Sequence, residues 1–211
     1  EVAKVQPEEK KPKPRPANLD PKNPYHLVAT DETLVIRSYV ADGPARGISV
    51  GMPNGISYCF DAEKSHVVFG WFGAFMDVGP DRGNGRGRGG RPNRTLGTRF
   101  SVGAGGFPVR IGEKKPNEVQ FRGYRRAKKE DVSFRYDVDG VSVQQKISPA
   151  KAGVGLAYQF TIEDAQSDVT FTVDREQVNA KATKGKWNGN ELKLTSAEAK
   201  SFTVEVMQKY N

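Results

Sequence analysis

Two segments of alternating polarity meet at an Asp-Gly pair in the sequence Val132-Ser133-Phe134-Arg135-Tyr136-Asp137-Val138-Asp139-Gly140-Val141-Ser142-Val143-Gln144-Gln145-Lys146-Ile147. A period of two is typical of a strand with one buried face. The Asp-Gly pair tolerates the positive φ angles that a two-residue hairpin turn requires. This stretch therefore predicts an antiparallel β-hairpin.

The same pattern continues on both sides of the hairpin. On the N-terminal side, Pro53-Asn54-Gly55 predicts a tight turn between two strands. The expected strands outside the hairpin lie at 33–40, 47–52, 56–61, 65–72, 118–124, 156–162, 169–173, 191–194 and 202–206. Ser196–Lys200 is expected to form one helical turn, and no segment has the pattern of a ten-residue amphipathic helix. We therefore expect an all-β fold over residues 25–211, an antiparallel β-sandwich of two large sheets, with a closed barrel as the alternative.

Residues 1–24 have a different composition, with six prolines among mixed charges. Such a segment buries little apolar surface and favours an extended, polyproline-like conformation. We expect a Pro-rich arm or linker that lies along a partner, and a disordered terminus is the alternative. The sequence has no apolar run of eighteen residues, so we expect no transmembrane segment. It also shows no signal peptide, as a mature secreted protein would after cleavage.

The positive charge is concentrated in one region. The chain carries a net charge of +8, and residues 81–130 contain 14 Lys and Arg against 4 Asp and Glu. A local basic excess attracts phosphate, sulfated or carboxylated polymers, or an acidic protein. Part of it is the basic segment Arg122–Lys129, which is either a solvated edge that discourages strand-to-strand aggregation or an extension of the same cationic surface.

The most basic part of this region is a glycine-rich loop at 78–95. Its arginines alternate with glycines that leave the backbone amides open, and guanidinium groups suit phosphate, sulfate and carboxylate. The predicted partner- or anion-binding residues are Arg82, Arg86, Arg88, Arg91 and Arg94. Nucleic acid is disfavoured as the partner because the loop holds no aromatic residue for stacking. The alternative is that these arginines pair with Asp77, Asp81 or nearby carbonyl groups and fix the loop to the domain.

An aromatic segment precedes this loop and contains the second candidate site. Trp71 and Phe75 with Asp61 and Asp77 could hold a sugar ring, by stacking on its C–H bonds and accepting its hydroxyl protons. In a strand, Trp71 and Phe75 lie on one face and Phe72 on the other, so at least one set belongs to the core. Core packing is the alternative for the whole cluster.

The remaining chemistry-bearing residues favour a non-catalytic protein. Cys59 is the single cysteine and lies in an apolar strand, so no intrachain disulfide or Cys-x-x-Cys metal site can form. His26 and His66 lack metal-ligand spacing, and we expect no metal and no cofactor. Nucleophile elbows, P-loops and Rossmann fingerprints are absent. The absence of these motifs does not exclude a carboxylate-based hydrolase or lyase of an unfamiliar kind.

A longer motif places the loop in a wider context. Residues 46–62 (Arg-Gly-Ile-Ser-Val-Gly-Met-Pro-Asn-Gly-Ile-Ser-Tyr-Cys-Phe-Asp-Ala), Gly70–Asp77, Gly87–Pro92 and Phe121–Tyr124 follow one another in register. Over about residues 33–147, the chain resembles an uncharacterised bacterial extracytoplasmic β module that occurs beside c-type cytochrome or sugar-oxidising domains in multidomain proteins. The chain lacks Cys-x-x-Cys-His, so any haem would be on another chain.

The resemblance implies a periplasmic or secreted location and a redox or carbohydrate-processing partner. The expected function is a non-catalytic accessory or structural subunit of an extracytoplasmic complex that contains, on this view, a c-type cytochrome for electron transfer. Its contacts would be the arginine-glycine loop and the N-terminal arm. The alternative function is a carbohydrate-binding or carbohydrate-modifying domain that uses Trp71 and the nearby aspartates on a polysaccharide.

Overall fold

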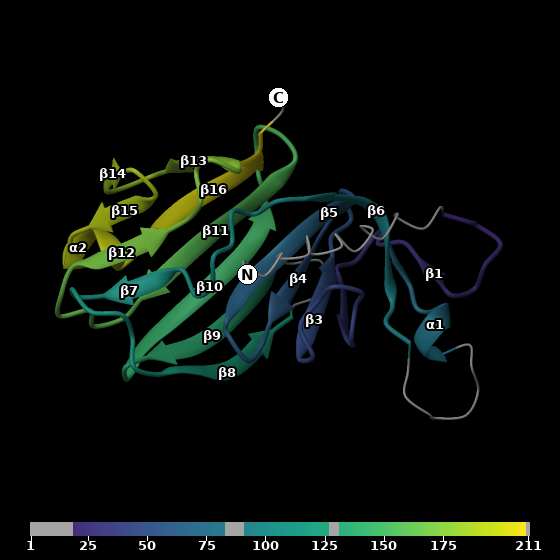
Figure 1. The fold of residues 1–211 in the computed structure, drawn as a ribbon, viewed down its shortest axis with the longest axis horizontal. Helices are drawn as coiled ribbons and strands as arrows, with labels where there is room; N and C mark the ends of the chain where they lie inside the picture. Colours follow the sequence, from purple (N-terminus) through teal and green to yellow (C-terminus); the bar gives the residue numbers. More distant parts are fainter. Residues whose placement is uncertain (1–18, 83–90, 127–130, 210–211) are drawn as a thin grey trace, which may run out of the picture.

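The computed structural model describes residues 19–82, 91–126 and 131–209. These residues form three antiparallel sheets and two helices of one turn each (Figure 1). The all-β sandwich that the sequence predicts is confirmed, and one of the sheets curls into half of a barrel. The helices are α1 (Gly79–Arg82) and α2 (Ser196–Ala199), and α2 is the helical turn expected near residue 196.

The first two sheets join strands that are mostly neighbours in the sequence, whereas the third sheet also joins distant strands. The first sheet has the order β1 (His26–Leu27), β5 (His66–Asp77), β4 (Ile56–Asp61), β3 (Gly47–Gly51), β2 (Leu34–Arg37), and β6 (Arg94–Phe100) also pairs with β5. The second sheet has the order β13 (Val178–Ala182), β16 (Phe202–Gln208), β11 (Gly155–Ile162), β10 (Val141–Pro149), β9 (Val132–Val138), β8 (Val119–Arg125). The third sheet has the order β14 (Lys186–Asn188), β15 (Glu191–Leu194), β12 (Val169–Thr172), β7 (Val109–Ile111).

The two turns predicted from the sequence form as expected. Asp139 and Gly140 have φ angles of 47° and 85°, the left-handed region that a tight hairpin between β9 and β10 needs. Gly55 has a φ of 81°, and the Asn54 Oδ1 accepts a hydrogen bond from the Ile56 N–H at 3.2 Å. These local signals fix the register of two hairpins.

One large core joins the three sheets. Phe60 of β4 stacks on Phe134 of β9 with 3.9 Å between ring centroids, which joins the first sheet to the second. Phe160 of β11 lies 5.5 Å from Phe171 of β12, which joins the second sheet to the third. All four rings are buried. The three sheets therefore share one continuous hydrophobic core.

The first sheet also has a smaller core on its opposite face. Cys59 belongs to this smaller core, whereas Phe60 belongs to the large one, as expected for consecutive residues of a strand. Trp71, Phe75 and Met76 of β5 fill the smaller core. The sheet therefore has a core on each face along parts of β5, whereas Phe72 and Gly73 in the middle of the strand are exposed.

Strand β5 is longer than the sequence predicts. We expected a strand at 65–72, and the structure continues it to Asp77. Gly70 looks like a strand breaker but is needed for packing, because a Cβ there would lie 2.3 Å from the Phe100 ring. Gly73 has a φ of 130° and marks a shift in the β5–β6 register, so the strand bends and continues.

Candidate functional site at the stems of the arginine-glycine loop

The arginine-glycine loop leaves and re-enters the first sheet between α1 and β6. Arg82 ends α1, Arg94 begins β6 and Arg91 precedes it, and all three residues are exposed. Arg86 and Arg88 lie outside the described residues. The structure thus places the three described arginines of the predicted site around the two stems of one loop.

Two exposed tyrosines accompany these stems. The Tyr25 carbonyl accepts the Val78 N–H at 2.9 Å, and the Tyr39 carbonyl accepts the Asn93 N–H at 2.9 Å. The tyrosine residues remain 40% and 49% exposed. We call the surface formed by Tyr25, Tyr39, Arg82, Arg91 and Arg94 the stem face; it lies at the end of the first sheet that holds β1 and α1 (Figure 1).

The segment that carries Tyr39 is held in place by Asn93 and Arg99. Asn93 is buried, and its amide donates to the Ser38 hydroxyl at 2.9 Å. The Arg99 guanidinium donates to the Ala41 carbonyl, forms an ion pair with Asp42 and lies 4.2 Å from the centroid of the Phe69 ring. The exposed tyrosine is therefore carried on a backbone that is fixed from both sides.

Sequence reasoning missed both tyrosines and Asn93. Tyr39 was expected inside a strand at 33–40, but β2 ends at Arg37 and the chain turns toward the loop stem. Tyr25 was placed at the border of the arm, and the described part of that arm forms a turn, in which the Asn23 N–H donates to the Asp20 carbonyl. The Asp20 N–H also donates to His26 Nδ1 at 2.8 Å, which fixes this segment beside the stem. Residues 1–18 lie outside the described residues.

The stem arginines do not form the aspartate pairs that the sequence left open. Within the described ranges, no carboxylate lies within ion-pair distance of Arg82, Arg91 or Arg94. Asp77 instead accepts the Gly79 N–H at 2.9 Å and faces His26. The stem face therefore presents three guanidinium groups to an incoming molecule.

Asp61 and Asp77 do not form a pair. Asp61 lies opposite His66, at the start of β5, and Asp77 ends the same strand. At about 3.3 Å per residue the two carboxylates are on the order of 30 Å apart. Asp61 accepts the backbone N–H groups of Glu63 and Lys64, so each aspartate stabilises a local turn. They cannot act together on one substrate atom.

Trp71 and Phe75 are core residues. Trp71 has no exposed surface and Phe75 is 1% exposed. The indole N–H donates to the Phe75 carbonyl at 2.8 Å, and the two rings stack with centroids 5.9 Å apart. Neither ring has a free face on which a sugar could stack, and Phe72 alone of the three aromatic side chains is exposed.

Cys59 and His66, two buried titratable groups of the first sheet, remain uncharged near neutral pH. Burial raises the pKa of the Cys59 thiol to about 12, which keeps it protonated and unreactive. Burial also lowers the pKa of His66 from its ordinary value of 6.5, although a hydrogen bond with the Lys64 carbonyl opposes this shift. Both groups have structural roles.

The lowered pKa of His66 predicts a loss of stability in mild acid. Below about pH 6.5 the unfolded chain binds a proton that the folded chain excludes until a lower pH, so the free energy of unfolding falls as the pH decreases. Urea unfolding of the wild type and of His66→Gln at pH 7.5 and pH 5.5 checks this. We expect the variant to lose less stability over this interval, and an equal loss in both proteins contradicts the assignment.

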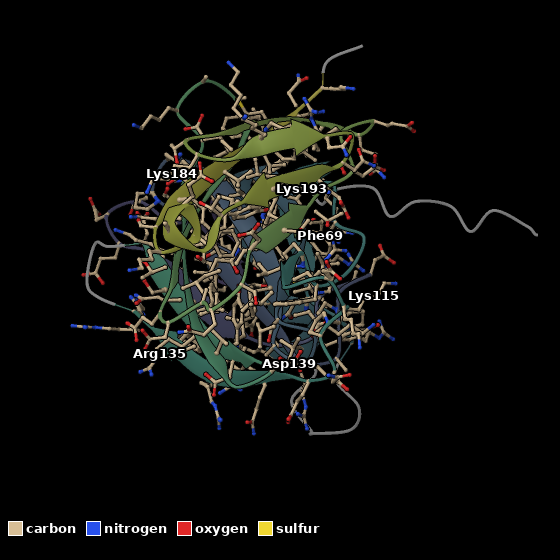
Figure 2. The ribbon with its side chains drawn as sticks, turned by 90° about the vertical axis from the view of Figure 1, so that its left-hand side faces the viewer. Phe69, Lys115, Arg135, Asp139, Lys184 and Lys193 are labelled. Atoms are coloured by element: carbon tan, nitrogen blue, oxygen red, sulfur yellow. The ribbon has the colours of Figure 1, made fainter. Side chains whose placement is uncertain are left out.

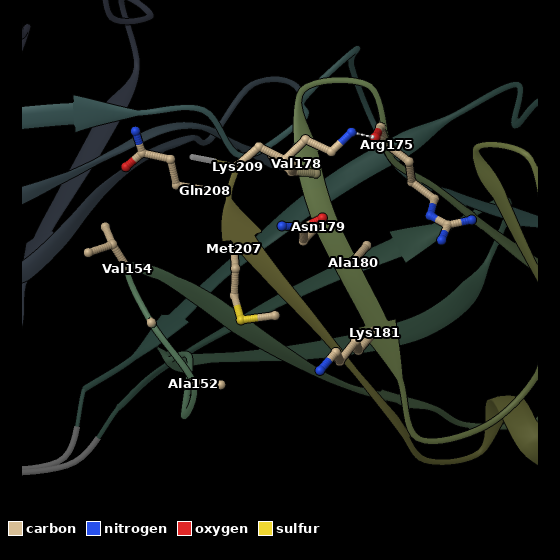
Figure 3. A pocket seen from close by; sticks show the side chains of 11 residues that line it. Ala152, Val154, Arg175, Val178, Asn179, Ala180, Lys181, Met207, Gln208 and Lys209 are labelled. Carbon is tan, nitrogen blue, oxygen red and sulfur yellow. Dashed lines mark hydrogen bonds between the residues drawn. The ribbon is translucent and has the colours of Figure 1, made fainter. Parts of the chain in front are cut away.

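A separate hollow of about 600 Å³ lies beside β13 and β16 (Figure 3). Met207, Asn179 and Lys181 line it, together with the backbone around Gly153. Two of its cations are already engaged, because the Lys209 ammonium donates to the Arg175 carbonyl at 2.8 Å and the Arg175 guanidinium lies over the Trp187 ring. Of the three cations in the lining, these two therefore already contact other parts of the chain.

Comparisons with protein-family models, with curated proteins and with solved structures found no match. The site must therefore be interpreted from its own chemistry. Across the described ranges, no three His, Cys, Asp or Glu side chains converge as metal ligands would. The two described helices, of four residues each, are too short to cross a bilayer.

Proposed function

We propose that the protein is a non-catalytic binding subunit that contacts a partner protein through the stem face. The observation that carries this proposal is the exposure of Tyr25 and Tyr39 on the two stems of a loop whose described arginines lack acidic partners. Tyrosine and arginine are enriched among the residues that dominate binding energy at protein interfaces. The fixed backbone beneath Tyr39 lowers the entropy lost on association.

The composition of the stem face indicates the chemistry of the partner. Three guanidinium groups without carboxylates favour a partner surface that is rich in Asp and Glu. The two tyrosine rings supply apolar contact area with a polar end, which suits a surface of mixed polarity. We therefore expect an acidic protein surface, bound with an affinity that decreases as salt increases.

The cellular setting is a further part of the proposal and follows from the resemblance to an extracytoplasmic module that we propose for residues 33–147. On that basis we propose a periplasmic or secreted location and a complex that includes a c-type cytochrome on another chain. Asp20, whose backbone N–H donates to His26 beside the stem, places the described end of the N-terminal segment there, and we propose that the segment adds to the same contact.

Co-purification from the native source tests the partner contact. We expect Tyr25→Ala combined with Tyr39→Ala, and separately Arg91→Ala combined with Arg94→Ala, to reduce recovery of the partner by about tenfold or more. The matched control removes two exposed lysines far from the stem face, Lys184 and Lys193, and should leave recovery unchanged.

Two outcomes would count against this proposal. Recovery of the same proteins in the same amounts with both stem variants would show that the stem face is not the contact. Equal losses with the lysine control would show that net charge alone governs recovery. A band with covalently bound haem among the partners would support the cytochrome complex, and its absence from a recovered complex would remove that part.

A further inference from the structure

A second arginine-lined surface lies on the outer face of the second sheet, over β8 to β11. A hollow of about 490 Å³ opens there, and we call it the arginine groove. Its lining includes Arg122, Arg125, Arg135, Gln144 and Glu163. Figure 2 shows Arg135 at the periphery of the molecule.

A glycine in β8 creates the hollow. Gly123 has a φ of 122° and lies opposite Arg135, next to a shift in the β8–β9 register. No atom lies within 4 Å of the place where a Cβ would be at this position. Because Gly123 contributes no side chain, the space between the arginines on either side of it stays open.

The pairing across the strands leaves a surplus of positive charge in this groove. Arg122 forms an ion pair with Asp137 at 2.6 Å. Arg125 lies opposite Ser133, and Arg135 lies between Gly123 and Gln144. Among the residues that the structure describes, neither of these two arginines has a carboxylate within ion-pair distance.

The unpaired arginines are not a general property of this face. Lys146, a neighbour on β10, lies 3.6 Å from Asp131, so this neighbouring cation is matched by an acid. Because Arg122 is paired with Asp137, Arg125 and Arg135 share the groove with the single carboxylate of Glu163. The groove therefore carries a surplus of positive charge, with two guanidinium groups beyond ion-pair distance of any described carboxylate.

We propose that the arginine groove binds an acidic polysaccharide, with Arg125 and Arg135 holding its carboxylate or sulfate groups. The two residues are diagonal neighbours on adjacent strands, with backbones about 7–8 Å apart, so they can hold two anionic groups of one chain. Hydroxyl groups of Ser133, Ser142 and Thr161 and the amide of Gln144 line the space and match the hydroxyl groups of a sugar.

The lining distinguishes this ligand from single-stranded nucleic acid. Proteins that bind single strands stack the bases on exposed aromatic rings. The aromatic residue in this lining is Tyr124, which is half-buried and packs 6.1 Å from the Phe134 ring in the core. The groove thus provides charge and hydrogen bonds without a stacking platform.

Affinity electrophoresis of the full chain tests this proposal. The probes are polygalacturonate, dextran sulfate, neutral dextran and a single-stranded oligothymidylate. We expect the two acidic polysaccharides to retard the wild type and neutral dextran to leave it unretarded. We expect Arg125→Gln combined with Arg135→Gln to weaken that retardation by about tenfold or more. Both side chains are exposed, so thermal unfolding should show that the variant folds as the wild type does.

The controls separate this groove from the stem face and from net charge. Lys184→Gln combined with Lys193→Gln removes the same charge elsewhere and should leave retardation unchanged. Arg91→Ala combined with Arg94→Ala removes two cations of the stem face and should weaken retardation much less than the groove variant does. Equal weakening in any of these proteins overturns the proposal, as does retardation by oligothymidylate that depends on Arg125 and Arg135. Retardation by dextran sulfate alone would assign the sulfated class.

Discussion

Replacing Trp71 by Ala is expected to lower the free energy of unfolding by about 3–5 kcal/mol. The side chain has no exposed surface and is one of the largest in the smaller core of the first sheet. Its removal would leave a cavity against Phe69 and Phe75 and would deprive the Phe75 carbonyl of its 2.8 Å hydrogen bond. Urea unfolding followed by far-ultraviolet circular dichroism measures the loss without relying on tryptophan fluorescence.

The next residue provides the control for this substitution. Phe72 lies on the same strand, is also aromatic and is 49% exposed, so Phe72→Ala should cost less than about 1 kcal/mol. Trp71→Phe should fall between the two, because it keeps most of the ring volume and loses the N–H donor. Equal losses for Trp71→Ala and Phe72→Ala would contradict the assignment of Trp71 to the core.

The second large effect is expected at the junction of the first and second sheets. Phe60→Ala should lower the free energy of unfolding by about 3–5 kcal/mol, since the Phe60 ring is fully buried between the two sheets. Its stacking on Phe134 and its contact with Phe121, 5.9 Å between centroids, would both be lost. Urea unfolding followed by tryptophan fluorescence and by circular dichroism measures the change with two probes.

The same experiment tests whether the described domain unfolds as one unit. A continuous core predicts that the two probes report one transition with the same midpoint, and that the substitution moves both midpoints together. Phe60→Leu, which keeps an apolar side chain of similar volume, should cost far less than Phe60→Ala. A first sheet that unfolds separately from the second, or a cost below about 1 kcal/mol for Phe60→Ala, would contradict this interpretation.

The features that the sequence predicts correctly are those with a local cause. Asp139-Gly140 and Asn54-Gly55 determine their turns within a few residues, so the residue types alone are enough to place the hairpins on either side. The predicted helical turn α2 also has a local cause. The Thr195 side chain accepts the Glu198 N–H and the Glu198 carboxylate accepts the Thr195 N–H, which forms a capping box.

The features that the sequence does not predict depend on neighbours far along the chain. Gly70 interrupts the apolar pattern of β5, and its purpose is visible only when Phe100 is placed beside it. The burial of Trp71 could not be predicted because apolar residues alternate onto both faces of β5, and only the structure shows that Trp71 and Phe75 are buried while Phe72 is exposed.

The two arginine surfaces also combine features with a local cause, which the sequence predicts, and features that depend on distant residues, which it does not predict. The loop arginines could be chosen from composition, but the exposure of Tyr39 depends on where β2 ends and on Asn93, fifty-four residues later. Arg125 belongs to the basic segment Arg122–Lys129, for which the sequence alone also allows the interpretation of a solvated sheet edge. In the sequence, Arg135 is one of several polar positions in the predicted hairpin, and its place opposite Gly123 follows from a register shift that no local pattern encodes.

The arrangement of strands implies an order of folding. Strands β2 to β5 and strands β8 to β11 are two meanders in which each strand pairs with the next one in the sequence. Strand β16 pairs with β11 although about forty residues separate them in the sequence, and β12 pairs with β7 although nearly sixty residues separate them. Short loops close first, so the meanders can form early while their apolar faces stay uncovered. During synthesis, the apolar face of the second sheet gains its contact with the third sheet only after residues 169–194 have left the ribosome, and until then it is a surface that a chaperone would have to shield.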